Sequence, residues 1–141
     1  MDSEVRNPMT RDGMKLLFVN CCLRRNAPTK VLPVGLAYIM TYVHERGYVN
    51  FDLLDLDIAD HEDSFVESRL ENGRYDAILL GSIVTHYKWV KWFIRTAKRI
   101  QPQAKIIVGN SVAGSIPEIL LSNAPADVAV IGEGEVSTYE A

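Results

Sequence analysis

The chain has 141 residues, 48% of them hydrophobic and 23% charged, so it is large enough for one globular domain with a substantial core. Its formal net charge of -3 at pH 7 argues against a nucleic-acid partner, because general nucleic-acid binders need a dominant basic surface. The two cysteines, Cys21 and Cys22, are adjacent and form no disulfide framework, so we expect a cytoplasmic location. No apolar run approaches the roughly 18 residues of a membrane-spanning helix, so we expect no membrane partner.

Short β-like runs alternate with longer helix-like runs from residue 14 onward, a pattern typical of a parallel sheet wrapped by helices. Residues 1–13 before them are polar, contain Pro8 and lack the apolar core of a signal peptide, so we predict a flexible lead-in. The expected strands are residues 15–20, 51–55, 77–82, 105–109 and 128–131. Only the second alternates apolar with acidic residues, which suits a strand at the edge of the sheet.

Helices are predicted between these strands. Their approximate ranges are residues 33–46, 60–71, 87–101 and 115–122. The first begins at Pro33, whose missing N–H is tolerated in a first turn, and Gly47 is its expected C-terminal cap. The apolar side of this helix is formed by Leu36, Ile39, Met40 and Val43. The last helix begins with Ser115 as its N-cap, and Glu118 completes a capping box.

Together these elements predict a three-layer, doubly wound α/β domain over residues 14–141, with a parallel five-stranded sheet in the flavodoxin-like order 2-1-3-4-5. Ligands of such sheets bind outside the carboxyl ends of the strands, next to the point where the strand order reverses. The loops that follow the strands are therefore the expected place of a binding site. Those loops are residues 20–32, 55–60, 82–86, 109–114 and 132–135.

The loops lack the motifs of several common ligands of this fold. No Gly-x-Gly-x-x-Gly follows the first strand and the chain has no P-loop, so a dinucleotide pyrophosphate has no usual cradle. The third strand ends in Gly81-Ser82, where a phospho-receiver needs an aspartate. The stretch 23–30 is basic and contains one threonine, which gives an FMN phosphate poor support.

Small and hydroxyl-bearing residues are instead concentrated at or just beyond the strand ends. They are Ser82, Thr85, Gly109, Asn110, Ser111, Gly114, Gly132 and Gly134. Small residues allow a ligand to approach the backbone, and hydroxyls bind its polar edge. Parallel α/β loops also use glycine, serine and asparagine for their turns, but agreement among three loops at one edge favours a binding slot.

Four segments carry a more specific resemblance. They are LPVGLAYI at 32–39, GSIVT at 81–85, IVGNS at 107–111 followed by IPE at 116–118, and VIGEGE at 130–135. In order and spacing they resemble the motifs of the cobalamin-binding domain found at the N-terminus of radical-SAM proteins. The best single match is 130–135, which is similar to that family's Val-x-Gly-Glu-Gly-Glu. The resemblance covers about residues 15–141.

The sequence departs from the wider cobalamin-binding pattern at two places. Mutases and methionine synthase carry Asp-x-His-x-x-Gly after the first strand, and the histidine ligates cobalt. Residues 20–25 contain no histidine, as is frequent in the radical-SAM class, so the resemblance implies cobalamin without an axial histidine from this domain. The paired glycines of the fourth strand are replaced by Gly109-Asn110, which places a side chain near the expected nucleotide tail.

The resemblance implies a slot for the dimethylbenzimidazole tail beside strands one and three, with the corrin resting across the loops at residues 20–33 and 132–134. The tail slot would be lined by Ser82, Thr85, Gly109 and Gly132. The full set of cofactor-binding residues implied is Asn20, Leu32, Pro33, Ser82, Ile83, Thr85, Gly109, Asn110, Gly132, Glu133 and Gly134. No catalytic or metal-ligating residue is expected in this chain.

The family's chemistry also implies a partner domain. A [4Fe–4S] cluster that cleaves S-adenosylmethionine needs Cys-x-x-x-Cys-x-x-Cys, which this chain lacks. A helix that begins after Gly134 stops at Ala141, so we expect the natural protein to continue into a covalently linked radical-SAM domain. This chain alone is then no enzyme, and it positions the corrin for methyl transfer or a related radical reaction.

Two alternatives stay open at this stage. One is a domain of such a protein that binds no cobalamin and serves docking, and the other is a small nucleotide or flavin binder. Among single features, Cys21 and Cys22 are interpreted as core or loop thiols, because neighbouring strand positions point to opposite faces. An acidic cluster is interpreted as a solvated edge: Asp52, Asp55, Asp57, Asp60, His61 and Asp63. Trp89 and Trp92 are candidates for a docking surface, and His86 lies near the expected slot.

Overall fold

The computed structural model describes residues 11, 13–22, 33–58, 62–132 and 138–140. Its elements are β1 (Lys15–Asn20), α1 (Val34–Glu45), β2 (Asn50–Asp55), α2 (Asp63–Asn72), β3 (Ala77–Gly81), the 3-10 turn η1 (Val84–His86), α3 (Tyr87–Ile100), β4 (Lys105–Gly109), α4 (Asn110–Ser115), α5 (Pro117–Asn123) and β5 (Val128–Ala129). Residues 138–140 are again helical. No helix in the described ranges combines the length and apolar character needed to cross a bilayer.

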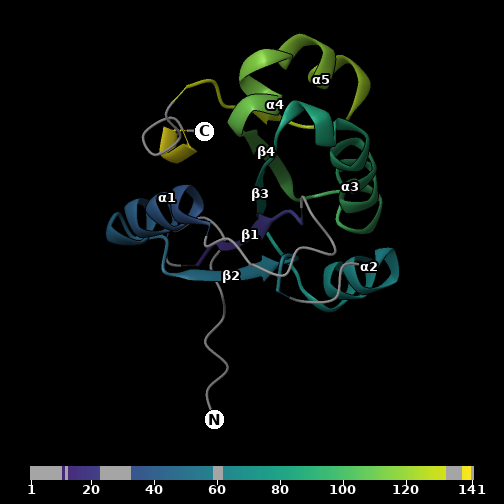
Figure 1. Ribbon diagram of the computed structural model, residues 1–141. Coiled ribbons are helices and arrows are strands. Elements are labelled where there is room, and N and C mark those ends of the chain that lie inside the picture. Colours follow the sequence, from purple (N-terminus) through teal and green to yellow (C-terminus); the bar gives the residue numbers. More distant parts are fainter. Residues whose placement is uncertain (1–10, 12, 23–32, 59–61, 133–137, 141) are drawn as a thin grey trace.

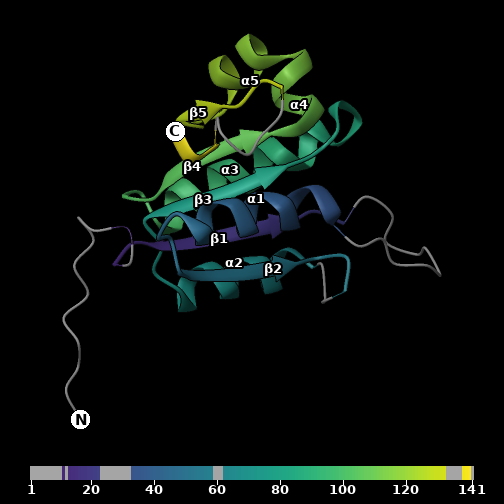
Figure 2. The same ribbon diagram turned by 90° about the vertical axis from the view of Figure 1, so that its left-hand side faces the viewer.

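The five strands form one parallel sheet in the order β2-β1-β3-β4-β5. Helix α1 covers one face of this sheet, whereas α2, α3, α4 and α5 cover the other (Figure 1). Turned by 90°, the strands run side by side with their carboxyl ends at one edge (Figure 2). The predicted three-layer, doubly wound architecture and its strand order are therefore confirmed.

Alternation along each strand divides the core in two. Leu17 and Val19 of β1 enter a large core against α2, α3, α4 and α5, whereas Leu16 and Phe18 enter a smaller core against α1. This two-sided burial explains why the central strands are apolar at consecutive positions. Of the residues of α1, only Val43 is fully buried, so α1 covers its face of the sheet far less completely than the opposite helices cover theirs.

The ends of α1 and α2 follow the expected signals. Pro33 is the N-cap of α1, and Gly47 after its last turn has a φ of +104°, a left-handed conformation in which glycine is favoured. The predicted apolar side of α1 packs on the sheet. Helix α2 ends at Asn72, one residue beyond the predicted range of 60–71, and begins at Asp63; residue 60, its predicted start, lies outside the described residues.

The prediction was wrong for residues 109–116. These residues were expected to form a loop followed by a helix with Ser115 as its N-cap, but residues Asn110–Ser115 form α4, and α5 begins at Pro117 with Ile116 as N-cap and no side-chain cap. Tertiary burial explains the difference: Val112 is fully buried, and its N–H donates to the carbonyl of Ser82 at 3.0 Å. A helix of six residues carries too little periodicity to be recognised in the sequence. β5 is also shorter than the predicted 128–131.

A buried glutamine joins three segments at the opposite, amino-terminal edge of the sheet. Gln101 follows α3, and its Oε1 accepts the backbone N–H of Tyr75 at 2.8 Å. Its Nε2 donates to the carbonyls of Leu70 and Gly73 at the end of α2. The single side chain thereby satisfies three backbone groups next to the start of β3.

We predict that Gln101→Leu lowers the free energy of unfolding by about 3 kcal/mol, because it leaves buried backbone groups without partners. Gln103→Leu is the matched control: Gln103 is exposed, so its replacement shifts stability by less than about 0.5 kcal/mol. Urea denaturation followed by circular dichroism measures both values. Equal stability of the two variants would contradict this role for Gln101.

Candidate functional site

A row of small residues crosses the carboxyl edge of the sheet. Asn20 of β1 is in register with Gly81 of β3, and Gly81 is in register with Gly109 of β4. On the other side, Asn20 pairs with Asp55 of β2. Gly81 and Gly109 occupy the same face of the sheet as Leu79 and Ile107, the face that α1 covers, because alternate residues of a strand share a face. Two adjacent strands thus end without side chains on the α1 side.

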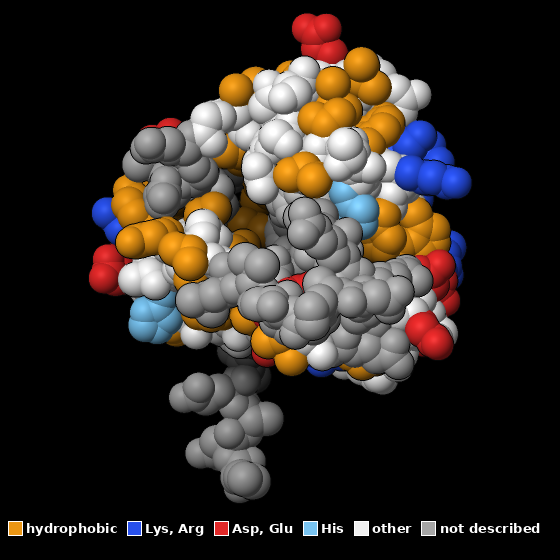
Figure 3. All heavy atoms as spheres, in the orientation of Figure 1, with side chains coloured by type: hydrophobic (Ala, Val, Ile, Leu, Met, Phe, Trp, Pro, Cys, Tyr) orange, Lys and Arg blue, Asp and Glu red, His pale blue; other side chains and the backbone are white. Residues whose placement is uncertain are grey.

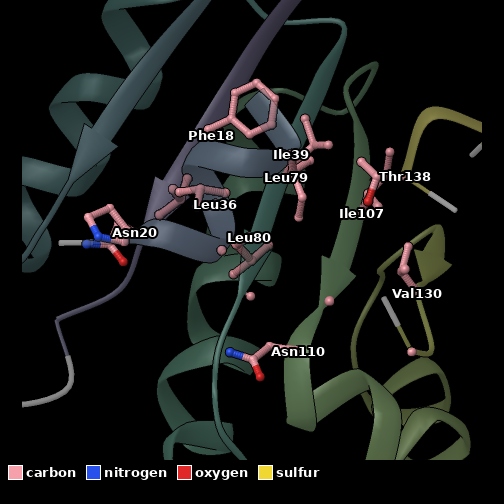
Figure 4. Close-up of a pocket in the computed structure, with 16 residues that line it drawn as sticks. Phe18, Asn20, Leu36, Ile39, Leu79, Leu80, Ile107, Asn110, Val130 and Thr138 are labelled. Carbon is pink, nitrogen blue, oxygen red and sulfur yellow. The ribbon is translucent and has the colours of Figure 1, made fainter. Parts of the chain in front are cut away.

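Beside this row lies a cavity of about 520 Å³ between α1 and the sheet. The hollow is visible in Figure 3, with hydrophobic side chains inside it. Phe18, Leu79 and Ile107 point into it from the sheet, and Leu36 and Ile39 reach it from α1 (Figure 4). Because these five side chains are all apolar, the interior suits the hydrophobic part of a ligand.

The mouth of the cavity is more polar and is lined largely by backbone. Asn20, Gly81, Gly109, Asn110 and Gly132 lie there, at or just beyond the carboxyl ends of the strands. A Cβ atom added to Gly109 would meet no other atom within 4 Å, so the space above this glycine belongs to the cavity. A ligand can therefore lie directly against the backbone at this position.

Thr138, in the short helical segment 138–140, also contributes to the lining of the cavity. The ring of Tyr139 lies beneath the guanidinium of Arg11, 5.1 Å from ring centre to Cζ, and packs edge-on against Tyr42 of α1. Arg46 also lies over the Tyr42 ring, 3.4 Å from its centre. These contacts link residues 138–140 to the end of α1 and hold them beside the cavity.

The structure brings together part of the site expected from the sequence. Five of the eleven cofactor-binding residues line the cavity: Asn20, Pro33, Gly109, Asn110 and Gly132. Three lie outside the described residues: Leu32, Glu133 and Gly134. The remaining three, Ser82, Ile83 and Thr85, do not line it. Their contact with a ligand stays a prediction. Of the four residues expected to line the tail slot, only Gly109 and Gly132 line this cavity.

The position of Ser82 follows from strand alternation. It comes directly after Gly81, so its side chain points to the opposite face, where it is buried and its Oγ lies 3.0 Å from Nδ1 of His86. The His86 ring in turn stacks on Trp89, with 5.2 Å between ring centres. Ile83 and Thr85 are exposed beyond the edge of the sheet.

Cys21 belongs to this opposite face as well. Burial raises the pKa of its thiol from 9.0 to about 12, outweighing a hydrogen bond with Ser82 that lowers it, while Cys22 adds a smaller rise. Both thiols lie in the large core, so the expectation that they point to opposite faces is wrong: β1 ends at Asn20, and strand alternation does not apply to the two residues after it. A thiol with this pKa is protonated at neutral pH and is a poor nucleophile, in keeping with its interpretation as a small core residue.

The acidic residues near β2 serve structural contacts where they are described. Asp52 forms an ion pair with Lys15 at 3.4 Å and accepts the Tyr75 hydroxyl at 2.9 Å. Asp55 accepts Nδ2 of Asn20 at 2.8 Å. In the described ranges no three His, Cys, Asp or Glu side chains gather in a way that would hold a metal ion, and Asp60 and His61 fall outside those ranges.

Several cavity residues were not predicted. They are Phe18, Val19, Gly35, Leu36, Ile39, Leu79, Leu80, Gly81, Ile107, Val130 and Thr138. The hydroxyl-bearing residues and glycines of the loops predicted a site formed by residues after the strands, whereas the cavity extends along the strands themselves. The available signal was alternation: Gly81 lies two positions after Leu79, and Gly109 lies two positions after Ile107, so each pair shares a face.

Comparison with known proteins identifies a family. The family model of the B12-binding domain matches residues 21–141. No curated protein sequence matches the chain significantly.

Three solved structures have a similar fold. The radical S-adenosylmethionine methyltransferase TsrM from Kitasatospora setae, solved with tryptophan substrate and a SAM analogue, matches with a TM-score of 0.74 at 16% identity, over 90% of this chain and 24% of that one. The cobalamin-dependent S-adenosylmethionine radical enzyme OxsB, with aqua-cobalamin and S-adenosylmethionine bound, matches with a TM-score of 0.76 at 18% identity, over 90% of this chain and 18% of that one. The pilus assembly protein CpaE from Caulobacter crescentus matches with a TM-score of 0.51 at 12% identity, over 89% of each chain.

At these identities the structural matches establish the fold alone. The chain spans 24% of TsrM and 18% of OxsB, so the match does not carry the activities of those whole enzymes to this chain.

We predict that Cys21 is almost unreactive in the native protein. In a Cys22→Ser variant, modification by a thiol reagent at pH 8 should be at least 1,000-fold slower than in urea, because a rise in pKa from 9.0 to about 12 reduces the thiolate about 1,000-fold. Burial slows the reaction further. Modification of the native variant at the rate of the unfolded chain would contradict the buried position of Cys21.

Proposed function

The chain belongs to the B12-binding domain family, and on this premise we propose that its α1-face cavity binds cobalamin. The observation that carries the proposal is the position of the cavity. It opens at the carboxyl ends of β1, β3 and β4, beside the reversal of strand order, where ligands of doubly wound sheets bind. Its apolar interior and glycine-lined mouth are observed independently of the family match.

The residues present fit the nucleotide tail of cobalamin. A volume of about 520 Å³ lies within the range of small-molecule sites, about 300–1,000 Å³, but is too small for the whole cofactor. The flat dimethylbenzimidazole would enter between the apolar side chains of α1 and the sheet. The sugar and phosphate would pass over Gly109, above which the space is open, and the corrin would lie outside, above the carboxyl edge.

We infer that this domain gives cobalt no axial histidine. Among the described residues that line the cavity there is no histidine. His86 is held on the opposite face by its contacts with Ser82 and Trp89. Cobalamin bound in this way would have its benzimidazole detached from cobalt and buried in the cavity.

The proposed role of the domain is to carry cobalamin for a radical-SAM partner. The names of TsrM and OxsB support the pairing, since both are S-adenosylmethionine radical enzymes that contain a domain of this fold. Cobalamin would supply methyl-transfer or related radical chemistry, while S-adenosylmethionine and a [4Fe–4S] cluster would be bound by a covalently linked domain. In this chain, Cys21 and Cys22 are core residues and offer no cluster ligand set.

A docking domain that binds no cobalamin is a second candidate function, and Asn110 supports it. Its side chain stands at the mouth of the cavity, where the family pattern has a second glycine. The similarity to CpaE also shows that this fold occurs in a pilus assembly protein. Titration with hydroxocobalamin separates the two functions, because a docking domain would bind no cobalamin.

Filling the cavity should weaken cobalamin binding without unfolding the domain. We predict that Gly109→Leu raises the dissociation constant for hydroxocobalamin at least tenfold, because the added side chain occupies space that is open above this glycine. Gly114→Leu is the matched control: Gly114 is also free of neighbours within 4 Å but does not line the cavity, so its affinity stays within twofold of the wild type. Absorbance titration measures the affinities, and circular dichroism confirms folding. Absence of saturable binding by the wild type, or equal affinity of Gly109→Leu, would contradict the proposal.

The state of the cobalt ligand gives an independent prediction. Electron paramagnetic resonance of bound cob(II)alamin should show cobalt hyperfine lines without the splitting that an axial nitrogen causes. The same spectrum is expected for His86→Ala, since His86 lies on the far face of the sheet. Nitrogen splitting in the wild-type complex would contradict a buried, detached benzimidazole, and its loss in His86→Ala would identify His86 as a ligand.

A further inference from the structure

The side-chain amide of Asn20 is oriented by an acidic neighbour. Its Nδ2 donates to Oδ1 of Asp55 at 2.8 Å. The assignment of nitrogen and oxygen is fixed by chemistry, because a carboxylate only accepts hydrogen bonds. Asp55 is itself held by the N–H of Asp57 at 3.1 Å. Within the described part of the chain, Oδ1 of Asn20 is left as an acceptor without a partner at the cavity mouth.

The amide of Asn110 is oriented in the opposite sense. Its Oδ1 accepts the backbone N–H of Ser111 at 2.7 Å. A backbone N–H only donates, so the oxygen is identified and Nδ2 keeps two N–H donors to offer. Asn110 has a φ of +63°, a left-handed conformation that asparagine tolerates better than most residues. Strained positions of this kind occur disproportionately at ligand sites.

The two asparagines flank Gly81: Asn20 is in register with it on β1, and the Cβ of Asn110 lies 3.2 Å from where a Cβ on Gly81 would be. Asn20, Gly81 and Gly109 are in register on three adjacent strands, so Asn20 and the end of β4 are about 10 Å apart, two strand spacings. Asn110 follows Gly109 directly. Figure 4 shows Asn20 at the end of β1 and Asn110 at the start of α4, with the end of β3 between them. Both side chains line the cavity.

We propose that Asn20 and Asn110, here called the asparagine pair, recognise neutral primary carboxamides at the rim of the corrin. This inference rests on the proposed function and deepens it. A primary carboxamide donates through its nitrogen and accepts through its oxygen, which matches the acceptor of Asn20 and the donor of Asn110. The corrin of cobalamin carries several such acetamide and propionamide groups. The asparagine pair therefore determines which side-chain chemistry of the corrin rim is accepted.

The surrounding charges favour an amide over a charged group. No charged side chain lines the cavity among the residues that the structure describes. A ligand carboxylate near Asn20 would face the acceptor Oδ1 of an amide that is hydrogen-bonded to Asp55. A ligand ammonium near Asn110 would face the two N–H donors of its Nδ2. Either arrangement leaves a polar group without a suitable partner, which costs more binding free energy than a good hydrogen bond gains.

Replacing Asn110 tests the pair directly, with cyanocobalamin as a neutral probe. Asn110→Asp keeps the acceptor for the Ser111 N–H but turns the free donor into an acceptor, so we expect at least tenfold weaker binding. Asn110→Gly removes the side chain and relieves the left-handed conformation, and it should bind about three- to tenfold more weakly while remaining at least as stable as the wild type. Gly114→Asp adds the same charge outside the cavity and should bind within twofold of the wild type.

The outcomes separate the inference from the proposed function. The asparagine pair is overturned if the wild type binds cyanocobalamin and Asn110→Asp binds it equally well, or Asn110→Gly binds it more tightly. The proposed cobalamin binding would then still stand. Wild type that fails to bind cyanocobalamin overturns the proposed function and the pair with it. Weaker binding by both Asn110 variants, with Gly114→Asp unaffected, supports the pair.

A second probe tests Asn20. In the monocarboxylic acids of cyanocobalamin, one rim carboxamide at a time is replaced by a carboxylate. We expect at least one isomer to bind the wild type tenfold or more weakly than cyanocobalamin, and the difference to shrink below threefold in Asn20→Ala, which removes the opposing acceptor. If every isomer binds the wild type as tightly as cyanocobalamin does, the asparagine pair does not recognise the corrin carboxamides.

Discussion

Strand alternation at the carboxyl edge is the constraint from which the site follows. In a parallel sheet, residues in register on neighbouring strands share a face, so glycines at equivalent positions of β3 and β4 remove two adjacent side chains from one side of the sheet. The same register directs Ser82 and Cys21 to the other side, into the large core. Space for a ligand exists on the α1 face because of where these glycines stand, and the glycine after β5 continues the opening.

The two faces of the sheet therefore have different roles. The face beneath α2 to α5 is densely packed and contains most of the fully buried residues, together with both cysteines. The α1 face is packed by fewer residues and holds the cavity. A rigid core on one side and a partly open layer on the other allow a flat ligand to be inserted without disturbing the packing that stabilises the sheet.

The sequence predicted the architecture well because each central strand is apolar on both faces and each long helix has a periodic apolar side. It also located the edge at which the cavity opens and five of its residues. It failed for α4, where the burial of Val112 determines a helix too short to have a recognisable period. It also grouped Ser82 with Gly109, although the Ser82 side chain points away from the face on which Gly109 lines the cavity, because loop composition indicates nothing of the alternation that strands impose.

Backbone amide shifts on titration with cyanocobalamin, which is diamagnetic, test the central claim most directly. The account predicts saturable shifts at Gly35, Gly81 and Gly109, which line the cavity, and little change at Gly73 and Gly114, which do not. Unchanged spectra at millimolar cyanocobalamin, or shifts concentrated on α2 and α3, would contradict a cobalamin site on the α1 face.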